Sequence, residues 1–281
     1  MTANEKRALE INACKVRMGV IEGTYAAKSG HPGGSLSSAD LFTYLYFKEL
    51  NIDPAQPDKP DRDRFVLSKG HCAPGLYAAL ALRGFFPWED LKTLRHIGSH
   101  LQGHPNMRST PGVDMSTGSL GQGVSAACGM ALAAKLQNNP CRVYTLLGDG
   151  EIEEGQVWEA FMFARHYKLD NLRVIIDNNG LQIDGPVEQV MSSYPILDKL
   201  AAFGFEAVEI DGHDFDALEG AFAQAETVKG KPFAILMKTT KGKGVSFMEN
   251  QVGWHGKAPN QEQYEIAMAE LKARLAELEA N

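Results

Sequence analysis

Two apolar runs flank a helical segment near the middle of the chain. The runs cover residues 143–147 and 172–176, and their nearly continuous apolar side chains are typical of buried strands. Residues 156–167 between them carry apolar side chains at helical spacing. A strand, a helix and a second strand in this order predict a parallel, right-handed unit, in which both strands end at the same edge of the sheet.

Further helices and strands alternate along the rest of the chain. Helical spacing covers residues 4–28, 38–49, 75–83, 87–98, 123–136, 194–203, 214–227 and 261–279, and strand patterns cover residues 64–68, 207–210 and 233–237. This alternation predicts a single α/β domain over residues 1–281, with a mostly parallel central sheet, helices on both faces and a helical tail at about residues 261–279. The glycine-rich loop of residues 99–123 has a length that is usually associated with function or disorder.

The turns after the two central strands contain ligands that suit a hard metal ion. Asp149 follows the first strand in Gly148-Asp149-Gly150, and Asn179 follows the second in Asn178-Asn179-Gly180. A carboxylate, an amide oxygen and a turn carbonyl form an all-oxygen set that suits Mg²⁺ or Ca²⁺. Mg²⁺ with few protein ligands usually completes its shell with phosphate oxygens, and glycines let the backbone approach a bulky anion. Each motif alone is an ordinary turn, but their matched positions favour a metal–diphosphate site.

Four histidines and one lysine also lie in turns rich in glycine and proline. They are His31, His71, His104, His255 and Lys241. The turn around His31, residues 29–34, is expected to be tight and exposed because it contains one proline and three glycines. Histidines and a lysine around a metal–diphosphate indicate chemistry on a bound cofactor, whereas surface histidines are the alternative for each turn taken alone.

Composition and charge exclude several classes of protein. The chain has 281 residues, a formal net charge of −7 and 44% hydrophobic residues, which is typical of a soluble globular protein and argues against nucleic-acid binding. The four cysteines have no C-x-x-C spacing, so the sequence indicates neither a disulfide framework nor a zinc site. The start of the chain lacks a signal-peptide pattern, and no apolar run approaches transmembrane length, so we expect a cytoplasmic protein with no membrane partner.

The turn motifs occur together, and in the same order, in a known family. They are Ser29-Gly30-His31-Pro32-Gly33, Ser68-Lys69-Gly70-His71, Gly103-His104-Pro105, Thr117-Gly118-Ser119-Leu120-Gly121-Gln122-Gly123, Gly148-Asp149-Gly150, Asn178-Asn179 and Trp254-His255-Gly256. Over roughly residues 5–260 the chain resembles the N-terminal, diphosphate-binding half of transketolase, a thiamine diphosphate enzyme. The resemblance implies the thiamine diphosphate-binding fold, that cofactor and Mg²⁺, with Ca²⁺ or Mn²⁺ as substitute ions.

The resemblance also assigns roles to individual residues at the cofactor. The implied metal ligands are Asp149, Asn179 and the carbonyl oxygen of Leu181. The implied cofactor contacts are His71, Gly150, Asn179 and His255 at the diphosphate end, with Lys241 as a further candidate, Gly118 and Leu120 at the aminopyrimidine, and Ile183 at the thiazolium ring.

A second group of residues resembles the family's catalytic groups. His31, His104 and His255 would hydrogen-bond the ketose donor and move protons at the reacting carbonyl. Glu154 and Glu159 resemble acids that link two cofactor sites across a dimer, and a plain surface position on a helix is the alternative for Glu159. The implied reaction transfers a two-carbon glycolaldehyde unit from a ketose phosphate to an aldose phosphate, as in the pentose phosphate pathway.

Length is the main departure from the family. A whole transketolase is more than twice as long, and this chain has only a helix after Lys257. We therefore expect a split enzyme, in which a C-terminal transketolase subunit supplies the pyrimidine-binding domain, two copies of each chain form an α2β2 heterotetramer, and this chain alone is inactive. The alternatives are a split enzyme for another sugar phosphate, such as a branched or sulfonated one, a relative of deoxyxylulose-phosphate synthase, the α subunit of a 2-oxo acid dehydrogenase, and a non-catalytic cofactor-binding homologue.

Overall fold

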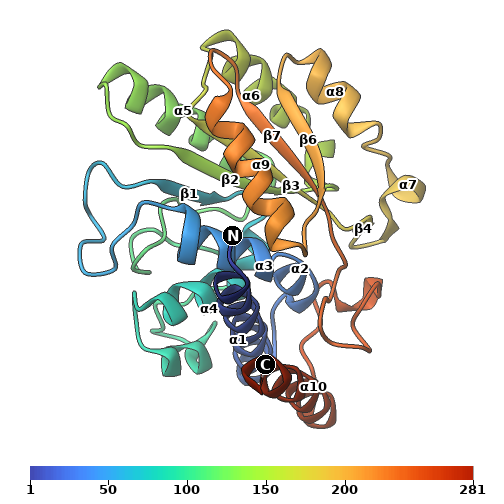
Figure 1. Ribbon diagram of the computed structural model, residues 1–281. Helices are drawn as coiled ribbons and strands as arrows, with labels where there is room; N and C mark the ends of the chain where they lie inside the picture. Colours follow the sequence, from blue (N-terminus) through green and yellow to red (C-terminus); the bar gives the residue numbers. More distant parts are fainter. Residues whose placement is uncertain (281) are drawn as a thin grey trace.

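A five-stranded parallel sheet forms the centre of the fold. The computed structural model describes residues 1–280, and the strands lie in the order β1-β2-β3-β7-β6 (Figure 1). They are β1 (Arg64–Leu67), β2 (Val143–Gly148), β3 (Leu172–Asn178), β6 (Glu206–Asp211) and β7 (Phe233–Lys238). Every neighbouring pair in this sheet runs parallel, which confirms the predicted α/β class.

The predicted strand–helix–strand unit is present at the centre of this sheet. Strands β2 and β3 pair directly, from Val143 opposite Leu172 to Gly148 opposite Asp177, and α6 (Gly155–His166) connects them. Because β1 and β7 flank this pair in parallel, the carboxyl ends of four strands meet at one edge of the sheet.

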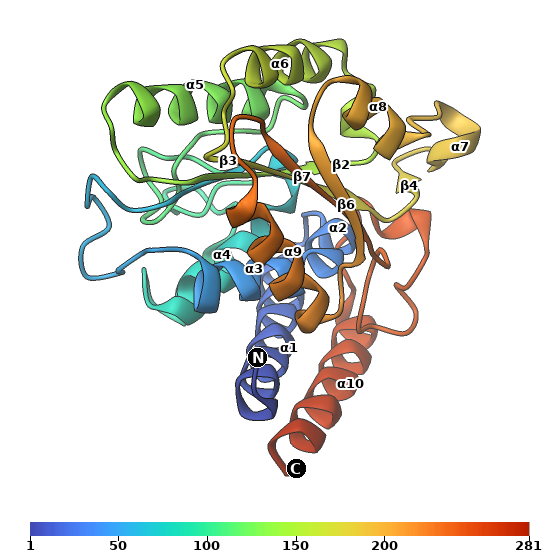
Figure 2. The same ribbon diagram turned by 45° about the horizontal axis from the view of Figure 1, so that its top comes forward.

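Helices cover both faces of the sheet. Helices α5 (Gln122–Leu136), α6 and α8 (Ile196–Ala202) cover one face, and α1 (Ala3–Ala27), α3 (Ala39–Tyr44), α4 (Ala73–Arg83) and α9 (Phe215–Thr227) cover the other (Figure 2). Along β3, Val174 and Ile176 join the core under α5 and α6, whereas Ile175 joins the opposite core. Both sets of side chains are therefore buried, which explains why the strands are apolar almost throughout.

The last helix packs against the first. Helix α10 (Gln261–Ala280) occupies the segment where the tail helix was expected, and it lies beside α1 in both views (Figures 1 and 2). Leu271 and Leu278 of α10 share a buried cluster with Val20 and Ile21 of α1. Within the described residues 1–280, no helix combines the length and the apolarity that a bilayer crossing requires.

Short elements fill the connections, and two of them correct the sequence predictions. The helix predicted over residues 38–49 is divided, because α3 ends at Tyr44 and a π-helical turn, Leu45–Glu49, follows. The helix predicted over residues 87–98 is only a 3₁₀ stretch, Trp88–Thr93. The remaining short elements are α2 (Pro32–Ser37), α7 (Val187–Val190), the antiparallel hairpin β4 (Leu181–Gln182) and β5 (Gly185–Pro186), and 3₁₀ turns at Gly70–Cys72, Glu151–Glu153 and Val252–Trp254.

The prediction of an exposed turn at residues 29–34 was wrong. Helix α2 begins at Pro32, and all its residues are buried. Proline is well suited to the first position of a helix, because that position needs no N–H donor. A side chain at Gly33 would lie 2.8 Å from the carbonyl oxygen of Trp254, and one at Gly34 would lie 2.8 Å from Cys72 Sγ. The glycines therefore allow close packing inside the molecule instead of forming a surface turn.

Candidate functional site

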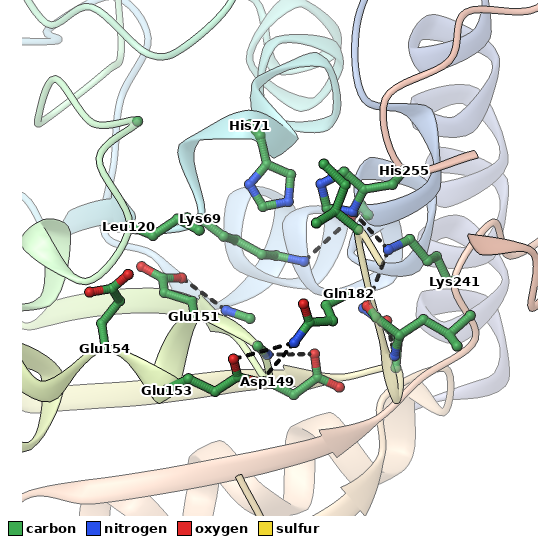
Figure 3. A pocket seen from close by; sticks show the side chains of 17 residues that line it. Lys69, His71, Leu120, Asp149, Glu151, Glu153, Glu154, Gln182, Lys241 and His255 are labelled. Carbon is green, nitrogen blue, oxygen red and sulfur yellow. Dashed lines mark hydrogen bonds between the residues drawn. The ribbon is translucent and has the colours of Figure 1, made fainter. Parts of the chain in front are cut away.

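A cavity of about 360 Å³ opens at the carboxyl ends of the central strands. Eleven of the residues that the sequence singled out line it, namely His71, Gly118, Leu120, Asp149, Gly150, Glu154, Asn179, Leu181, Ile183, Lys241 and His255. Figure 3 shows basic side chains, including His71 and Lys241, opposite acidic side chains, including Asp149. The cavity therefore has the position that the strand pattern predicted and a pronounced separation of charge.

Asp149 lies in the turn directly after β2. Its side chain is almost completely buried, and its carboxylate accepts hydrogen bonds from the backbone N–H groups of Gly150 (2.9 Å) and Gly180 (2.6 Å). Burial, together with the nearby charge of Asp177, raises the pKa of Asp149 to about 7. No side-chain cation in residues 1–280 forms an ion pair with this carboxylate, so the carboxylate is available to a bound cation.

Asn179 and Leu181 follow β3 and turn back towards Asp149. The Asn179 side-chain oxygen accepts a hydrogen bond from the Leu181 N–H (3.1 Å), and its side-chain nitrogen donates one to Asp177 (2.9 Å). Gly180 between them has a φ of 74°, a conformation that glycine adopts without strain. The same short segment thus brings an amide oxygen and a backbone carbonyl to the cavity that Asp149 lines.

Four histidines from distant parts of the chain gather at the cavity; His71 and His255 line it, and His31 and His104 lie beside them. The ring centroids of His31, His71 and His255 lie 5.0–5.5 Å apart, and the exposed His104 lies 6.2 Å from His31. Burial lowers the pKa of His31 to about 4 and that of His255 to about 3, with the charges of Arg95 and Lys241 respectively as the next cause. These imidazoles are therefore neutral near pH 7 and can both donate and accept hydrogen bonds.

Lys241 is a buried cation without a carboxylate partner. Its side chain is 2% exposed, and its ammonium group donates hydrogen bonds to the carbonyl oxygen of Leu181 (3.1 Å) and to Nδ1 of His255 (3.0 Å). No carboxylate in residues 1–280 forms an ion pair with it, and burial lowers its pKa. A buried charge is costly unless it is paired, so the site favours an anionic ligand at this position.

The sequence did not single out four charged residues of the site, namely Lys69, Glu151, Glu153 and Asp177. Lys69 and Asp177 form a buried ion pair, and Glu151 accepts hydrogen bonds from Ser68 Oγ (2.5 Å) and from the N–H groups of Gly121 and Gly148 (both 3.0 Å). Lys69 was visible only as a member of the motif Ser68-Lys69-Gly70-His71, and Glu151 only as the residue after Gly148-Asp149-Gly150.

The remaining predicted residues lie at the mouth of the cavity or outside it. Leu120 and Ile183 are 37% and 62% exposed at the rim, and Glu154 is exposed at the start of α6. Glu159 is exposed on the surface of α6 and does not line the cavity. Gly118 lies against the ring of His104, because a side chain added there would meet that ring at 3.0 Å.

The described residues fit a magnesium ion with a diphosphate. Asp149, the Asn179 amide oxygen and the Leu181 carbonyl provide an all-oxygen set for a hard cation, and Lys241, His71 and His255 provide donors for an anion. Asp149 and Lys241, which form no ion pair within residues 1–280, are two groups that such a ligand would neutralise.

Comparison with known proteins identifies relatives of the whole chain. Residues 8–275 match the family model described as transketolase, thiamine diphosphate binding domain. The chain is 50% identical over 243 residues to a 6-deoxy-6-sulfo-D-fructose transketolase subunit from Clostridium sp. (strain MSTE9), which covers 86% of this chain and 88% of the relative. It is 44% identical over 271 residues to an apulose-4-phosphate transketolase subunit from Phocaeicola vulgatus, which covers 96% of each chain.

A solved structure gives the same result. The transketolase from Campylobacter jejuni superposes with a TM-score of 0.89 at 33% sequence identity. The match covers 99% of this chain and 46% of the solved chain, so the present chain spans less than half the length of that transketolase. The chain therefore belongs to the transketolase family and corresponds to the family's thiamine diphosphate-binding domain.

Proposed function

We propose that this chain is the diphosphate-binding subunit of a split transketolase that acts with thiamine diphosphate and Mg²⁺. The observation that carries the proposal is the pair of unpartnered charges, Asp149 and Lys241, at the carboxyl ends of parallel strands of one sheet. Relatives named as transketolase subunits, similar over most of their own length, support the two-chain form.

The residues of this chain would hold the cofactor by its diphosphate. Asp149, Asn179 and the Leu181 carbonyl would bind the metal ion, with Ca²⁺ or Mn²⁺ as substitutes. His71, His255 and Lys241 would donate hydrogen bonds to the diphosphate, and Gly150, which has no side chain, would let the backbone lie close to it. The metal ion would serve as a template that anchors the cofactor.

The organic part of the cofactor would lie towards the mouth of the cavity. Gly118 and Leu120 would line the aminopyrimidine, and Ile183 would lie against the thiazolium ring. When bound, thiamine diphosphate supplies the nucleophilic carbon that receives the two-carbon unit.

Three histidines would bind the sugar donor. His31, His104 and His255 lie close enough together to hydrogen-bond neighbouring hydroxyl groups of one ketose. Because burial keeps His31 neutral, His31 can accept a proton from a hydroxyl group and return it during cleavage and formation of the carbon–carbon bond. Nδ1 of the neutral His255 accepts from Lys241, so this imidazole can donate a hydrogen bond from Nε2.

A second chain would complete the site. Leu120 and Ile183 line the cavity and expose 37% and 62% of their surface, and apolar side chains exposed together at its mouth fit a surface that another protein covers. The proposed partner is a C-terminal transketolase subunit with the pyrimidine-binding domain, in an α2β2 heterotetramer in the cytoplasm. Glu154 and Glu159 would lie between two cofactor sites of this assembly.

The donor is a phosphorylated or sulfonated ketose. One similar subunit is named for 6-deoxy-6-sulfo-D-fructose and another for apulose 4-phosphate, and both names describe an anionic sugar. We propose the transfer of a glycolaldehyde unit from such a donor to an aldose phosphate, with xylulose 5-phosphate of the pentose phosphate pathway as the first donor to compare.

The test is reconstitution with a candidate C-terminal chain from the same genome. The complex is assayed with thiamine diphosphate, Mg²⁺, ribose 5-phosphate and each of the three donors. We expect activity only when both chains are present, its loss in Asp149→Ala, and its retention in Asp184→Ala, which removes an exposed acid on the β4–β5 turn. Activity of this chain alone would refute the split enzyme, and cofactor binding without turnover of any donor would favour a non-catalytic homologue.

A further inference from the structure

Asp177 lies beneath the candidate metal ligands and is completely buried. It is the sixth residue of β3, and its carboxylate accepts hydrogen bonds from four side chains. Ser37 Oγ donates at 2.7 Å and Asn179 Nδ2 at 2.9 Å, and Lys69 Nζ and Thr239 Oγ1 are the other donors. These donors come from α2, from the end of β3, and from the turns after β1 and β7, so one carboxylate joins four segments of the site.

The contact between Asp177 and Asn179 determines which way the Asn179 amide faces. An asparagine amide has a donor nitrogen on one side and an acceptor oxygen on the other. A carboxylate surrounded by donors accepts hydrogen bonds, so only the nitrogen of Asn179 can face Asp177. The oxygen is then directed to the other side, where it accepts the Leu181 N–H in the segment that lines the cavity.

The contact between Asp177 and Lys69 keeps a competing cation away from the metal site. Lys69 lines the same cavity as Asp149 and is 2% exposed. Its ammonium group donates to the Gly34 carbonyl (3.3 Å), to Ser38 Oγ (2.7 Å) and to Asp177, which together use its three hydrogens. Without Asp177, this buried cation would have Asp149 as a nearby carboxylate to neutralise it.

We propose that Asp177 is a positioning residue of the metal site. It fixes the amide of Asn179 with its oxygen available to the metal ion, and it holds Lys69 away from Asp149. This inference rests on the proposed metal site. Asp177 would act through Asn179 and Lys69, without contacting the metal ion itself. Partners that orient metal ligands commonly change metal affinity about 10–100-fold when they are replaced.

Two double variants separate the positioning role from the removal of a buried charge. Both carry Lys69→Met, so that no buried cation loses its partner, and position 177 is changed to asparagine in one and to leucine in the other. Asparagine retains an oxygen that accepts from Asn179 Nδ2, whereas leucine has a similar size and no acceptor. Replacement of a buried ion pair by apolar side chains of similar volume is often tolerated, so the leucine variant is expected to fold.

The measurement is Mn²⁺ affinity, from the electron paramagnetic resonance signal of free Mn²⁺, in the two-chain complex with thiamine diphosphate. We expect the Asp177→Asn double variant to bind within about 3-fold of the wild type, and the Asp177→Leu double variant to bind about 10–100-fold more weakly. Ser37→Ala serves as the matched control, because it removes one donor to Asp177 and leaves the Asn179 contact in place. Equal affinity of the two double variants would overturn the proposal.

A single variant provides a second test that is independent of how the double variants fold. Asn179→Asp adds negative charge to the metal site and, by charge alone, should tighten metal binding. The proposed role predicts the opposite, a loss of about 10-fold or more, because one carboxylate oxygen would then face Asp177. Unchanged or tighter Mn²⁺ binding by this variant would overturn the proposal. Failure of the wild-type complex to bind Mn²⁺ at all would instead refute the proposed function, and this inference with it.

Discussion

Replacement of His31 by glutamine should change how the stability of the chain depends on pH. Burial, together with the charge of Arg95, lowers the pKa of His31 from 6.5 to about 4. The Nδ1 atom of His31 is buried and has no hydrogen-bond partner within residues 1–280, so no contact compensates a proton added there. The folded chain therefore keeps this imidazole neutral over a pH range in which the unfolded chain protonates it.

The sign and the size of the effect follow from the two pKa values. Between pH 6.5 and about 4 the unfolded state binds more protons at this position than the folded state, so the stability of the folded state decreases as the pH falls. At pH 5.5, one pH unit below the unfolded pKa of 6.5, the loss is about 1.4 kcal/mol relative to pH 8. Glutamine does not titrate, so the variant is free of this loss.

The assay is urea unfolding of the wild type and of His31→Gln at pH 8 and at pH 5.5. At each pH, the free energy of unfolding of the wild type is subtracted from that of the variant. This subtraction removes the contributions of other groups, including Asp149, whose raised pKa stabilises the folded state as the pH falls. We expect the stability difference between variant and wild type to shift by about 1.4 kcal/mol in favour of the variant at pH 5.5. The same substitution at His166, which is exposed on α6, should produce no such shift. If the free energies of unfolding of His31→Gln and the wild type differ by the same amount at both pH values, the assignment of a buried, neutral imidazole is refuted.

Two further predictions concern the ligand and the backbone around it. Lys241→Met removes a charged hydrogen-bond donor, so it should weaken thiamine diphosphate binding by about 10–100-fold in a calorimetric titration. Lys238→Met, at an exposed position three residues earlier, is the control and should leave thiamine diphosphate binding unchanged. Gly70→Ala should lower the free energy of urea unfolding by about 1–3 kcal/mol, because its Cβ would lie 2.7 Å from the backbone nitrogen of Gly118. Gly155→Ala, which meets no atom within 4 Å, is the control, and equal effects of the two alanines would contradict this packing argument.

The hydrophobic pattern predicted the central unit well because its strands are buried on both faces. β2 and β3 are almost continuously apolar, and the turns that follow them contain Asp149 and Asn179. Adjacent parallel strands must end at the same edge, so the meeting of these two residues followed from topology alone. The histidines are different, because nothing in their spacing brings His31, His71 and His255 within 6 Å of one another. Their positions in turns rich in glycine and proline suggested a shared site, and the resemblance to a family assigned them to it.

The buried polar network could not be predicted from local sequence. The apolar pattern of β3 stops at Ile176, yet the strand continues through Asn178, and Asp177 pairs in register with Met237 of β7. A buried carboxylate in a strand is stable only when its donors are present, and here they come from segments far apart in the sequence. The turn at residues 29–34 was misjudged for the same reason, because glycine and proline favour a turn locally and only the packing against Trp254 reveals a buried helix.

The charges of the site show why a dipolar ligand fits it better than a simple anion or a simple cation. Lys69 and Asp177 neutralise each other, and three uncharged donors stabilise the buried carboxylate of Glu151. Two further buried charges of opposite sign are Asp149 and Lys241. These two do not pair, because the Lys241 ammonium bonds to the Leu181 carbonyl and to His255 instead. A metal ion alone would neutralise Asp149 and be repelled by Lys241. A phosphate alone would neutralise Lys241 and be repelled by Asp149. A divalent cation carried by a diphosphate places each charge beside the group that lacks it, so the two halves of the site gain affinity only together.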